Sequence, residues 1–446
     1  MLPIISLLQV LQSKLTSAKI LQLADFLYCF MCIRYGVSVR SLSRYSNYSV
    51  RTWFRFLAED YPWVSIRVKL FLKWVYKEQN RYILAIDEVV EGKSRDKTHG
   101  LSKFWSSIQK RPISGICFFC ATIIAVGNRK PYPMAIEQVV HTEEDKNRIA
   151  EQKKRTAAGK RRSAEGRCLV RGRKKGSKNQ PKQPNPTASY RAFTTLLSTL
   201  LSCLSGINLT YLVADGAYAS ADYLLAVSNA GLHLITRLPA NVALVLPYTA
   251  AQKHKKKPKK YGEKVDLNKL DKQYLKDTKT EDDLLIQTWQ LPCYNKSTSK
   301  NLLNVVVVKA TNFKTKKVAF SILCTTDPTL DWQTMTDYYS LRFQIEFDFR
   351  DAKQFFGLSD FKNYTPKNLT NFVNLSFLAT LVAKMMQAQY QVKYNHPNFS
   401  ILDLKILFSA RFTVKAVIKL VQKSPQAIFN PHFADEFMPT DLVNAA

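Results

Sequence analysis

Three consecutive apolar, β-rich runs constrain the fold of this chain more than any other feature. They span residues 81–90, 113–126 and 132–140, and a turn at GNRKPYP joins the second run to the third. The spacing of apolar residues at 188–204 then predicts an amphipathic helix. Strands followed by a helix are typical of an α/β fold. We therefore expect a mixed sheet flanked by helices.

Two acidic side chains stand out in this pattern, because the chain has 66 Lys and Arg residues but only 34 Asp and Glu residues. Asp87 lies inside the run RYILAIDEVV, where a carboxylate is costly unless it is paired or bound to a cation. Its neighbour Glu88 should point to the opposite face of the strand. Asp215 follows a further predicted strand, in NLTYLVADGAYAS, at the edge where α/β sheets place their ligands. A carboxylate held by backbone N–H groups, or a helix cap, is the structural alternative at each position.

The segment YSLRFQIEFDFRDAK, residues 339–353, singles out a third acid. On one continuous helix, an arc of about 60° would contain the side chains of Tyr339, Arg342, Glu346 and Lys353. The other two carboxylates of the segment would point elsewhere. One acid would thus be flanked by two cations and a phenol. A surface stripe of ion pairs, with Arg342 bonded to Glu346, is the structural alternative.

The net charge of +32 exceeds what solubility requires and implies a polyanionic partner. The positive charge is spread over several segments, which favours nucleic acid over a membrane surface. The longest apolar run, residues 113–126, is too short to span a bilayer. The first residues lack the basic region and cleavage site of a signal peptide. We expect no membrane partner and a cytoplasmic location.

The eight cysteines give no sign of a disulfide framework, which is typical of a reducing compartment. Cys29 and Cys32, like Cys117 and Cys120, have the C-x-x-C spacing of zinc sites. Both pairs lie in apolar runs without the turn residues of a zinc knuckle. This context favours buried cysteines.

Residues 1–80 have helical spacing and end in a possible helix-turn-helix. Ser38 and Ser49 are predicted to cap two short helices, with a turn at Asn47 between them. The second helix carries Arg51 and Arg55, which suit a DNA groove. Its predicted apolar side consists of Val50, Phe54 and Leu57. Plain helix packing is an equally open interpretation.

Residues 145–187 are rich in Lys and Arg and nearly devoid of apolar residues, which predicts a flexible or extended insertion. Its stretch RGRKKGSKN is typical of an arm that enters a DNA minor groove. The arm would use Arg171, Arg173, Lys174 and Lys175. A solvated loop is the alternative, although so much positive charge should still bind phosphate.

The spacing Tyr339-x2-Arg342-x3-Glu346-x6-Lys353 resembles the Y-x2-R-x3-E-x6-K signature of bacterial insertion-sequence transposases of the DDE superfamily. Asp87 in YILAIDE and Asp215 in YLVADGAYAS look like the first two acids of that family. The stretches RGRKKGSKN, KYGEKVDL and RFQIEFDFRDAKQFFGL are also similar, and the resemblance covers roughly residues 80–390. One departure is Val89, which takes the Thr position of the usual D-x-T form.

The resemblance implies a ribonuclease-H-like mixed sheet core flanked by helices, with a helical N-terminal DNA-binding region and a β-rich insertion. The expected divisions are 1–80 for the DNA-binding region, 81–240 for the first part of the core with the basic insertion 145–187, 241–330 for the β-rich insertion, 331–392 for the last part of the core, and 393–446 for a helical tail.

The resemblance also implies cut-and-paste transposition. Asp87, Asp215 and Glu346 would be the catalytic residues and would hold two Mg²⁺ or Mn²⁺ ions. The side chains expected to contact DNA at the element ends are Tyr339, Arg342 and Lys353. The implied partners are double-stranded element ends and target DNA, bound by a homodimer on paired ends in the nucleoid.

Relatives that form a DNA hairpin stack a Trp of the insertion on a flipped base. Trp289 is the candidate here, with core packing as the alternative. Two other functions stay open: a catalytically retired DNA-binding protein derived from a transposase, and a ribonuclease-H-like nuclease or resolvase.

Overall fold

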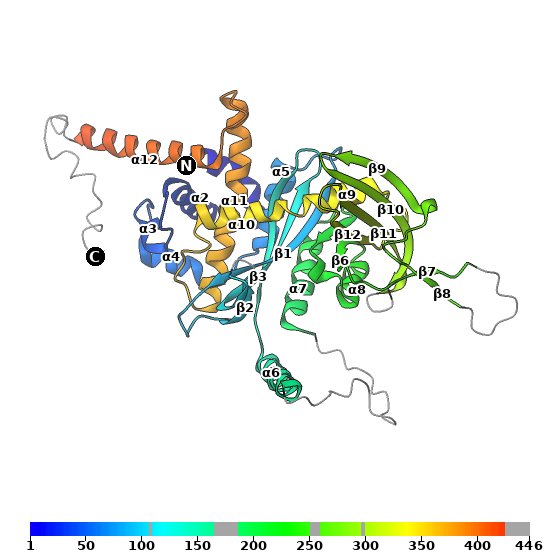
Figure 1. The fold of residues 1–446 in the computed structure, drawn as a ribbon. Helices are drawn as coiled ribbons and strands as arrows, with labels where there is room; N and C mark the ends of the chain where they lie inside the picture. The colour runs from blue at the N-terminus through cyan, green and yellow to red at the C-terminus, as the bar shows by residue number, and fades with distance from the viewer. Residues whose placement is uncertain (107–108, 165–185, 250–258, 296–298, 424–446) are drawn as a thin grey trace.

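The computed structural model describes residues 1–106, 109–164, 186–249, 259–295 and 299–423. In these ranges twelve strands form one sheet, with helices packed against it (Figure 1). The strands are β1 (Tyr82–Gly92), β2 (Ser102–Ser106), β3 (Arg111–Ala125), β4 (Lys130–Val139), β5 (Tyr211–Ala214), β6 (His233–Leu238), β7 (Leu244–Pro247), β8 (Tyr261–Lys264), β9 (Leu275–Glu281), β10 (Leu284–Asn295), β11 (Ser299–Asn312) and β12 (Val318–Thr325).

The strand order is β2-β3-β1-β5-β6-β12-β11-β10-β7-β8, with β4 also paired to β3 and β9 to β10. In the first half, β1 pairs antiparallel with β3 and parallel with β5, and β5 pairs parallel with β6. The three predicted strands that open the core are confirmed as β1, β3 and β4. The short strand β2 was not expected. This mixed sheet with flanking helices is consistent with a ribonuclease-H-like fold.

The strands of 241–330 continue the same sheet instead of forming a detached one. The link is β12, which pairs antiparallel with β6 on one side and with β11 on the other. These strands have an apolar core of their own, which includes Leu291, Val305 and Ile322. The insertion is therefore β-rich as predicted, while its boundaries as a domain stay a prediction.

The N-terminal part is helical, as predicted. Its helices are α1 (Leu2–Leu8), η1 (Gln9–Ser13), α2 (Ser17–Cys32), α3 (Val39–Ser43), α4 (Val50–Leu57) and α5 (Trp63–Trp74). The hydroxyls of Ser38 and Ser49 cap α3 and α4, as expected. The turn between these helices is held by buried Asp25 of α2, whose carboxylate accepts hydrogen bonds from the backbone and side chain of Asn47.

The predicted apolar side of α4 is wrong at one position. Phe54 is 42% exposed, whereas Trp53 is fully buried and stacks on Phe26 of α2 with ring centroids 3.6 Å apart. The ring of Trp53, not that of Phe54, therefore fills the space between α2 and α4. Arg51 and Arg55 are exposed, as a DNA-contacting face requires.

The helices around the core sheet are α6 (Glu143–Ala164), α7 (Ala188–Cys203), η2 (Gly216–Tyr218), α8 (Ala221–Asn229), η3 (Lys272–Tyr274), α9 (Trp332–Leu341), α10 (Gln344–Phe356), α11 (Pro366–Lys393) and α12 (Ile401–Lys423). Phe193 of α7 packs on Phe119 of β3, so α7 covers one face. The hydroxyl of Thr122, also in β3, bonds to Asp348 of α10, which covers the other face.

Helix α11 is a long, mostly apolar helix that crosses the core. By length and composition it could span a bilayer, but 89% of its most apolar window is buried inside the fold. Such burial is what the central helix of a packed core shows. It lies between the N-terminal helices and α10 (Figure 1).

The prediction that 145–187 is flexible or extended is wrong for its first part, because α6 runs to Ala164. The sequence of α6 is rich in Ala, Glu, Gln, Lys and Arg, all good helix formers, and three of its four acids lie in the first turn. High charge therefore prevents a packed face but not a helix. Arg171, Arg173, Lys174 and Lys175 lie outside the described residues.

Candidate active site

Asp87 and Asp215 lie side by side because their strands are parallel neighbours. The register pairs Ala85 with Val213 and Ile86 with Ala214, and the residue that follows the last pair in each segment is the aspartate. Residues paired across parallel strands point to the same face. The predicted position of Asp215, directly after β5, is confirmed.

Glu346 comes from a third element, the first turn of α10, and an arginine links it to the sheet. Arg342 Nη1 donates to Asp87 Oδ2 at 3.0 Å, and Arg342 Nη2 lies 3.7 Å from Glu346 Oε1. The side chains of Asp87, Arg342 and Glu346 are 22%, 18% and 44% exposed. The arginine therefore offsets the repulsion between two carboxylates that solvent can still reach.

The three acids border one open pocket of about 790 Å³. Its walls also include Arg342, Lys353 and Trp105. A pocket of this size falls in the range of ligand sites. Acids from two strands and a helix thus meet cationic side chains at one surface hollow.

Burial raises the pKa of Asp87 to about 6, against the opposing effects of the Glu88 N–H and of Arg342. The N–H of Glu88 donates to Asp87 Oδ1 at 2.8 Å. The negative charges of Asp215 and Glu346 raise this pKa further. The ionisation of Asp87 therefore depends on the charges of both other acids, and any cation that enters the pocket favours the charged form of Asp87.

The donor set suits a hard divalent cation, because it consists of carboxylate oxygens from separate elements around an open hollow. Among the residues that the structure describes, however, no three Asp, Glu, His or Cys side chains lie close enough together to hold a metal ion. Arg342, paired with Asp87 and near Glu346, provides the positive charge between these two carboxylates. A shared ion would require the acids to draw closer than they are here.

The expectation that one continuous helix carries Tyr339 to Lys353 is wrong. Helix α9 ends at Leu341 and α10 begins at Gln344. At the junction, Arg342 N–H donates to the carbonyl oxygen of Tyr339, a shorter step than in an α-helix. Residue spacing alone could not show this break, and the arc predicted for the four side chains does not apply across it.

Lys353 contacts a fourth acid that the sequence pattern did not single out. Its Nζ lies 2.7 Å from Oε1 of Glu91, a side chain only 7% exposed. The hydroxyl of Ser359 donates to the other carboxylate oxygen at 2.9 Å. Glu91 lies four residues after Asp87 in β1, and strand alternation places both on the same face. The alternation of side chains along β1 could therefore have identified Glu91 from the sequence.

Tyr339 is partly buried, and burial raises its pKa. Arg342 and Arg237 act in the opposite direction, and Asp215 adds to the rise. Tyr339 therefore lies within electrostatic reach of the second acid. Glu88, as expected, faces away from α10: it hydrogen-bonds Ser189 of α7, and burial raises its pKa.

The prediction that Trp289 contacts DNA is corrected by its burial. It is 7% exposed and belongs to the core of the insertion strands, which is the core-packing alternative. Trp105 of β2 is 63% exposed and borders the acid-lined pocket instead. Sequence spacing gave no signal for Trp105, because β2 itself was not predicted.

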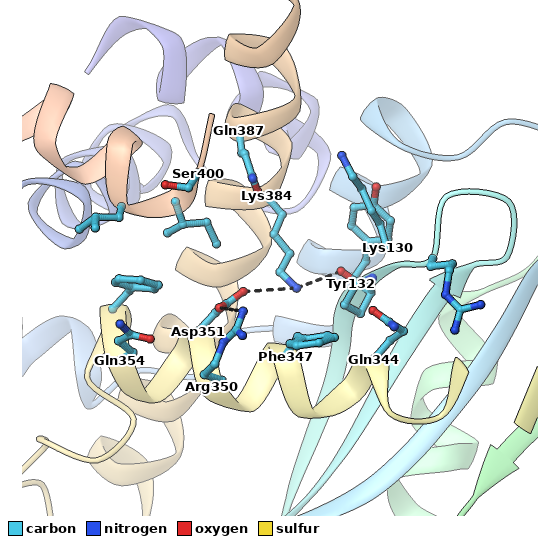
Figure 2. A pocket seen from close by; sticks show the side chains of 15 residues that line it. Lys130, Tyr132, Gln344, Phe347, Arg350, Asp351, Gln354, Lys384, Gln387 and Ser400 are labelled. Carbon is cyan, nitrogen blue, oxygen red and sulfur yellow. Dashed lines mark hydrogen bonds and ion pairs between the residues drawn. The ribbon is translucent and has the colours of Figure 1, made fainter. Parts of the chain in front are cut away.

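A second pocket, of about 460 Å³, lies against another stripe of α10 (Figure 2). Lys384 of α11 crosses its floor, 3.7 Å from Asp351 Oδ2 and bonded to the carbonyl oxygen of Pro131 at 3.2 Å. The same lysine bonds to fully buried Asp348. This buried network fastens the helix of Glu346 to α11 and to the sheet.

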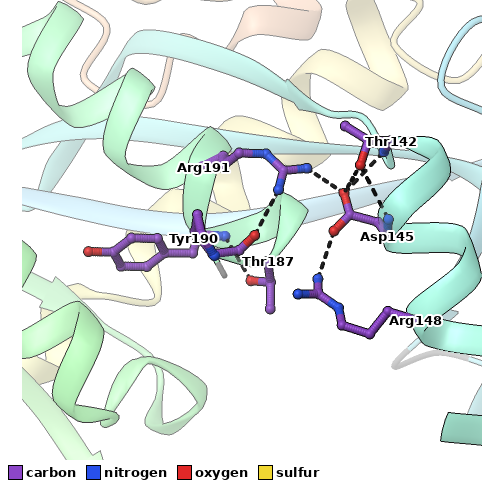
Figure 3. Close-up of polar contacts among 7 residues, drawn as sticks. Thr142, Asp145, Arg148, Thr187, Tyr190 and Arg191 are labelled. Carbon is purple, nitrogen blue, oxygen red and sulfur yellow. Dashed lines mark hydrogen bonds and ion pairs between the residues drawn. The ribbon is translucent and has the colours of Figure 1, made fainter. Parts of the chain in front are cut away.

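The base of α6 is fastened to α7 through Asp145 (Figure 3). The carboxylate accepts hydrogen bonds from Arg191 of α7, from Arg148 at 2.7 Å and from the hydroxyl of Thr142 at 3.0 Å. Burial opposes ionisation of Asp145, but Arg191 and the backbone N–H and hydroxyl of Thr142 outweigh it and lower the pKa of Asp145 to about 2. Beyond this contact, residues 150–158 of α6 are all exposed.

A comparison with known families matches residues 13–291 to the DDE superfamily endonuclease family. The matched range contains Asp87 and Asp215 and ends before Glu346. A search of curated proteins found no match. Since the family match covers more than half of the 446 residues, the chain belongs to the DDE superfamily endonuclease family.

Proposed function

We propose that this chain is a DNA transposase that binds the ends of an insertion sequence, nicks them by hydrolysis and transfers the strands to target DNA by cut-and-paste transposition. The observation that carries the proposal is the meeting of Asp87, Asp215 and Glu346 at one pocket bordered by Arg342 and Lys353. A hollow bordered by both acids and cations suits a phosphodiester next to a metal ion.

DDE superfamily endonucleases use divalent metal ions, and we propose two Mg²⁺ or Mn²⁺ ions held by the three acids. When bound, the ions would activate a water or a 3′-hydroxyl and stabilise the leaving oxygen. Arg342 would exchange its bond with Asp87 for a DNA phosphate. Tyr339 and Lys353 would contact the same strand, and Lys353 would do so only after loosening its ion pair with Glu91.

The net charge of +32 supports double-stranded DNA as the partner. Arg51 and Arg55 on the exposed side of α4 would contact one part of the duplex, and the basic helix α6 another. The segment with Arg171, Arg173, Lys174 and Lys175 is proposed as a minor-groove arm. We further propose a homodimer on paired ends, in the cytoplasm and associated with the nucleoid.

The test is cleavage of supercoiled plasmid that carries the element ends, in the presence of Mg²⁺ or Mn²⁺. Asp87→Asn, Asp215→Asn and Glu346→Gln are each expected to abolish nicking while DNA binding is retained. Asp337→Asn, which changes an exposed carboxylate of α9, is the matched control and should nick normally. Unchanged cleavage in the three acid variants would reject the assignment.

A catalytically retired DNA-binding protein is the second candidate. It is favoured by the lack of a three-ligand metal cluster among the described residues and by the pairing of Arg342 with Asp87. DNA binding without metal-dependent nicking would support it. Nicking without joining of a 3′-hydroxyl end to target DNA would instead support a ribonuclease-H-like nuclease.

A further inference from the structure

The pocket on the second stripe of α10 has the chemistry of a nucleotide site. Three kinds of side chain border it: the aromatic rings of Tyr132, Phe347 and Phe355, the amides of Gln344, Gln354 and Gln387, and the cations Arg129, Lys130 and Arg350. Rings stack on bases, amides bond to base edges, and cations hold phosphates. Its volume of about 460 Å³ lies in the range of small-ligand sites.

The charges of the pocket favour an anion. The carboxylate of Asp351 is bonded to Arg350 at 3.3 Å and lies 3.7 Å from Lys384. Lys384 is in turn paired with Asp348, which is fully buried beneath the floor. Within the part of the chain that the structure describes, Arg129 and Lys130 bond to neutral partners, the hydroxyl of Ser340 and the amide oxygen of Gln391. A positive excess therefore remains at the wall formed by the turn between β3 and β4.

Phe347 is placed to stack on a flat ligand. The guanidinium of Arg350 lies 4.7 Å from the centre of its ring, and Figure 2 shows both side chains on the pocket side of α10. Arg350 is 60% exposed, so it can move towards a phosphate. The buried bonds of Lys384 hold the floor in place, which makes the pocket preformed.

The pocket adjoins the acid-lined one. Arg350 and Gln354 border both pockets, so the two hollows meet at this edge of α10. A DNA strand with a phosphate beside Asp87 and Glu346 could therefore continue over Arg350 without leaving the protein surface.

We propose that this pocket binds one unpaired nucleotide of the DNA strand that occupies the acid-lined pocket, with its base on Phe347 and its phosphate on Arg350. The inference rests on the proposed function, because it takes the acid-lined pocket as the place of the scissile phosphate. It adds a second contact to that strand, on the side of α10 that faces α11 and α12.

The experiment measures binding of the full chain, without metal ion, to a duplex with one unpaired 2-aminopurine nucleotide. The same duplex with an abasic nucleotide and a fully paired duplex serve as references. Stacking predicts about tenfold tighter binding of the unpaired base than of the abasic duplex, and a loss of 2-aminopurine fluorescence. Phe347→Ala should remove both effects and leave binding of the paired duplex unchanged.

Phe313→Ala is the matched control, since Phe313 is 43% exposed in the insertion and far along the sheet from α10. Arg350→Gln is the second variant and should weaken binding of the unpaired nucleotide several-fold while keeping the fluorescence loss. If Phe347→Ala binds the three duplexes as the wild type does, the inference is overturned. It is also overturned if free deoxyadenosine monophosphate competes as well as the unpaired duplex.

These results separate the two proposals. A chain that nicks plasmid through its three acids but shows no preference for the unpaired base contradicts the nucleotide pocket alone. A chain that prefers the unpaired base, yet nicks equally well without its acids, contradicts the transposase assignment and keeps the pocket as a DNA site.

Discussion

Two groups of ion pairs lie on either side of α10, and they differ in exposure. On the side of the acid-lined pocket, Arg342 joins Asp87 and Glu346, and solvent reaches all three side chains. On the other side, Lys384 is 11% exposed and is bonded to Asp348, which is fully buried and also bonded to the hydroxyl of Thr122.

The buried ion pairs fix the position of α10, whereas the partly exposed ion pairs are available to bind a ligand. Charges that are buried and bonded on every side have no alternative partner, so they fix α10 to the sheet and to α11. Partly exposed charges can exchange partners at little cost, because water replaces part of what they lose. The side with Arg342 can therefore accept a ligand while the side with Lys384 keeps Glu346 in place.

The largest expected effect comes from breaking the buried group. Lys384→Met leaves Asp348 buried without its cation, which should lower the free energy of unfolding by about 3–5 kcal/mol. Chemical denaturation would measure the loss. Lys314→Met is the matched control, because Lys314 pairs with Asp283 at 2.7 Å but is 74% exposed, and it should cost less than about 1 kcal/mol.

Removing both charges tests the reason for that loss. Lys384→Met combined with Asp348→Leu should recover much of the stability, because no uncompensated buried charge remains. Equal losses for Lys384→Met and Lys314→Met would show that the buried group does not anchor α10.

The next effect is the pH dependence of the metal-free protein. Burial raises the pKa of Asp87 from 3.8 to about 6 in the folded chain. Between these values the folded state binds more protons than the unfolded state, so stability falls as pH rises through this window. The loss attributable to Asp87 should reach about 3 kcal/mol and be complete above the folded pKa.

Asp87→Asn isolates this effect, because the amide does not titrate. The difference in unfolding free energy between the wild type and Asp87→Asn, measured from about pH 4 to about pH 7, should change across the window. A difference that stays constant with pH would contradict the raised pKa and the crowding of acids that contributes to it.

Local patterns in the sequence were enough to find the acids of the strands. Apolar runs bounded by turns gave β1, β3, β4 and β5, and Asp215 lies directly after β5 as predicted. Parallel pairing of β1 with β5 then brings Asp215 beside Asp87. These features depend on spacing within ten or so residues, which periodicity describes well.

The same patterns could not give the contacts between distant segments. Lys384 and Asp348 are 36 residues apart in sequence, and Thr122 is 226 residues from Asp348. The break between α9 and α10 was missed for a related reason: a helical wheel assumes unbroken rotation. Phe54 was predicted to be buried, but Trp53 is buried instead, because packing against the neighbouring helix α2 decides which ring is buried.

The smallest expected change in stability is that of Arg342→Gln, and it tests most directly whether the two sides of α10 differ. Arg342→Gln removes the cation beside Asp87 and should change the unfolding free energy near neutral pH by about 1 kcal/mol or less, because solvent screens the pair. Arg342 lowers the pKa of Asp87, so its loss should move the pH-dependent step to higher pH. Repeating the Asp87→Asn comparison in the Arg342→Gln background measures that movement. A large loss of stability with an unmoved step would mean that Arg342 anchors α10 as Lys384 does, and the two sides of the helix would then not differ in kind.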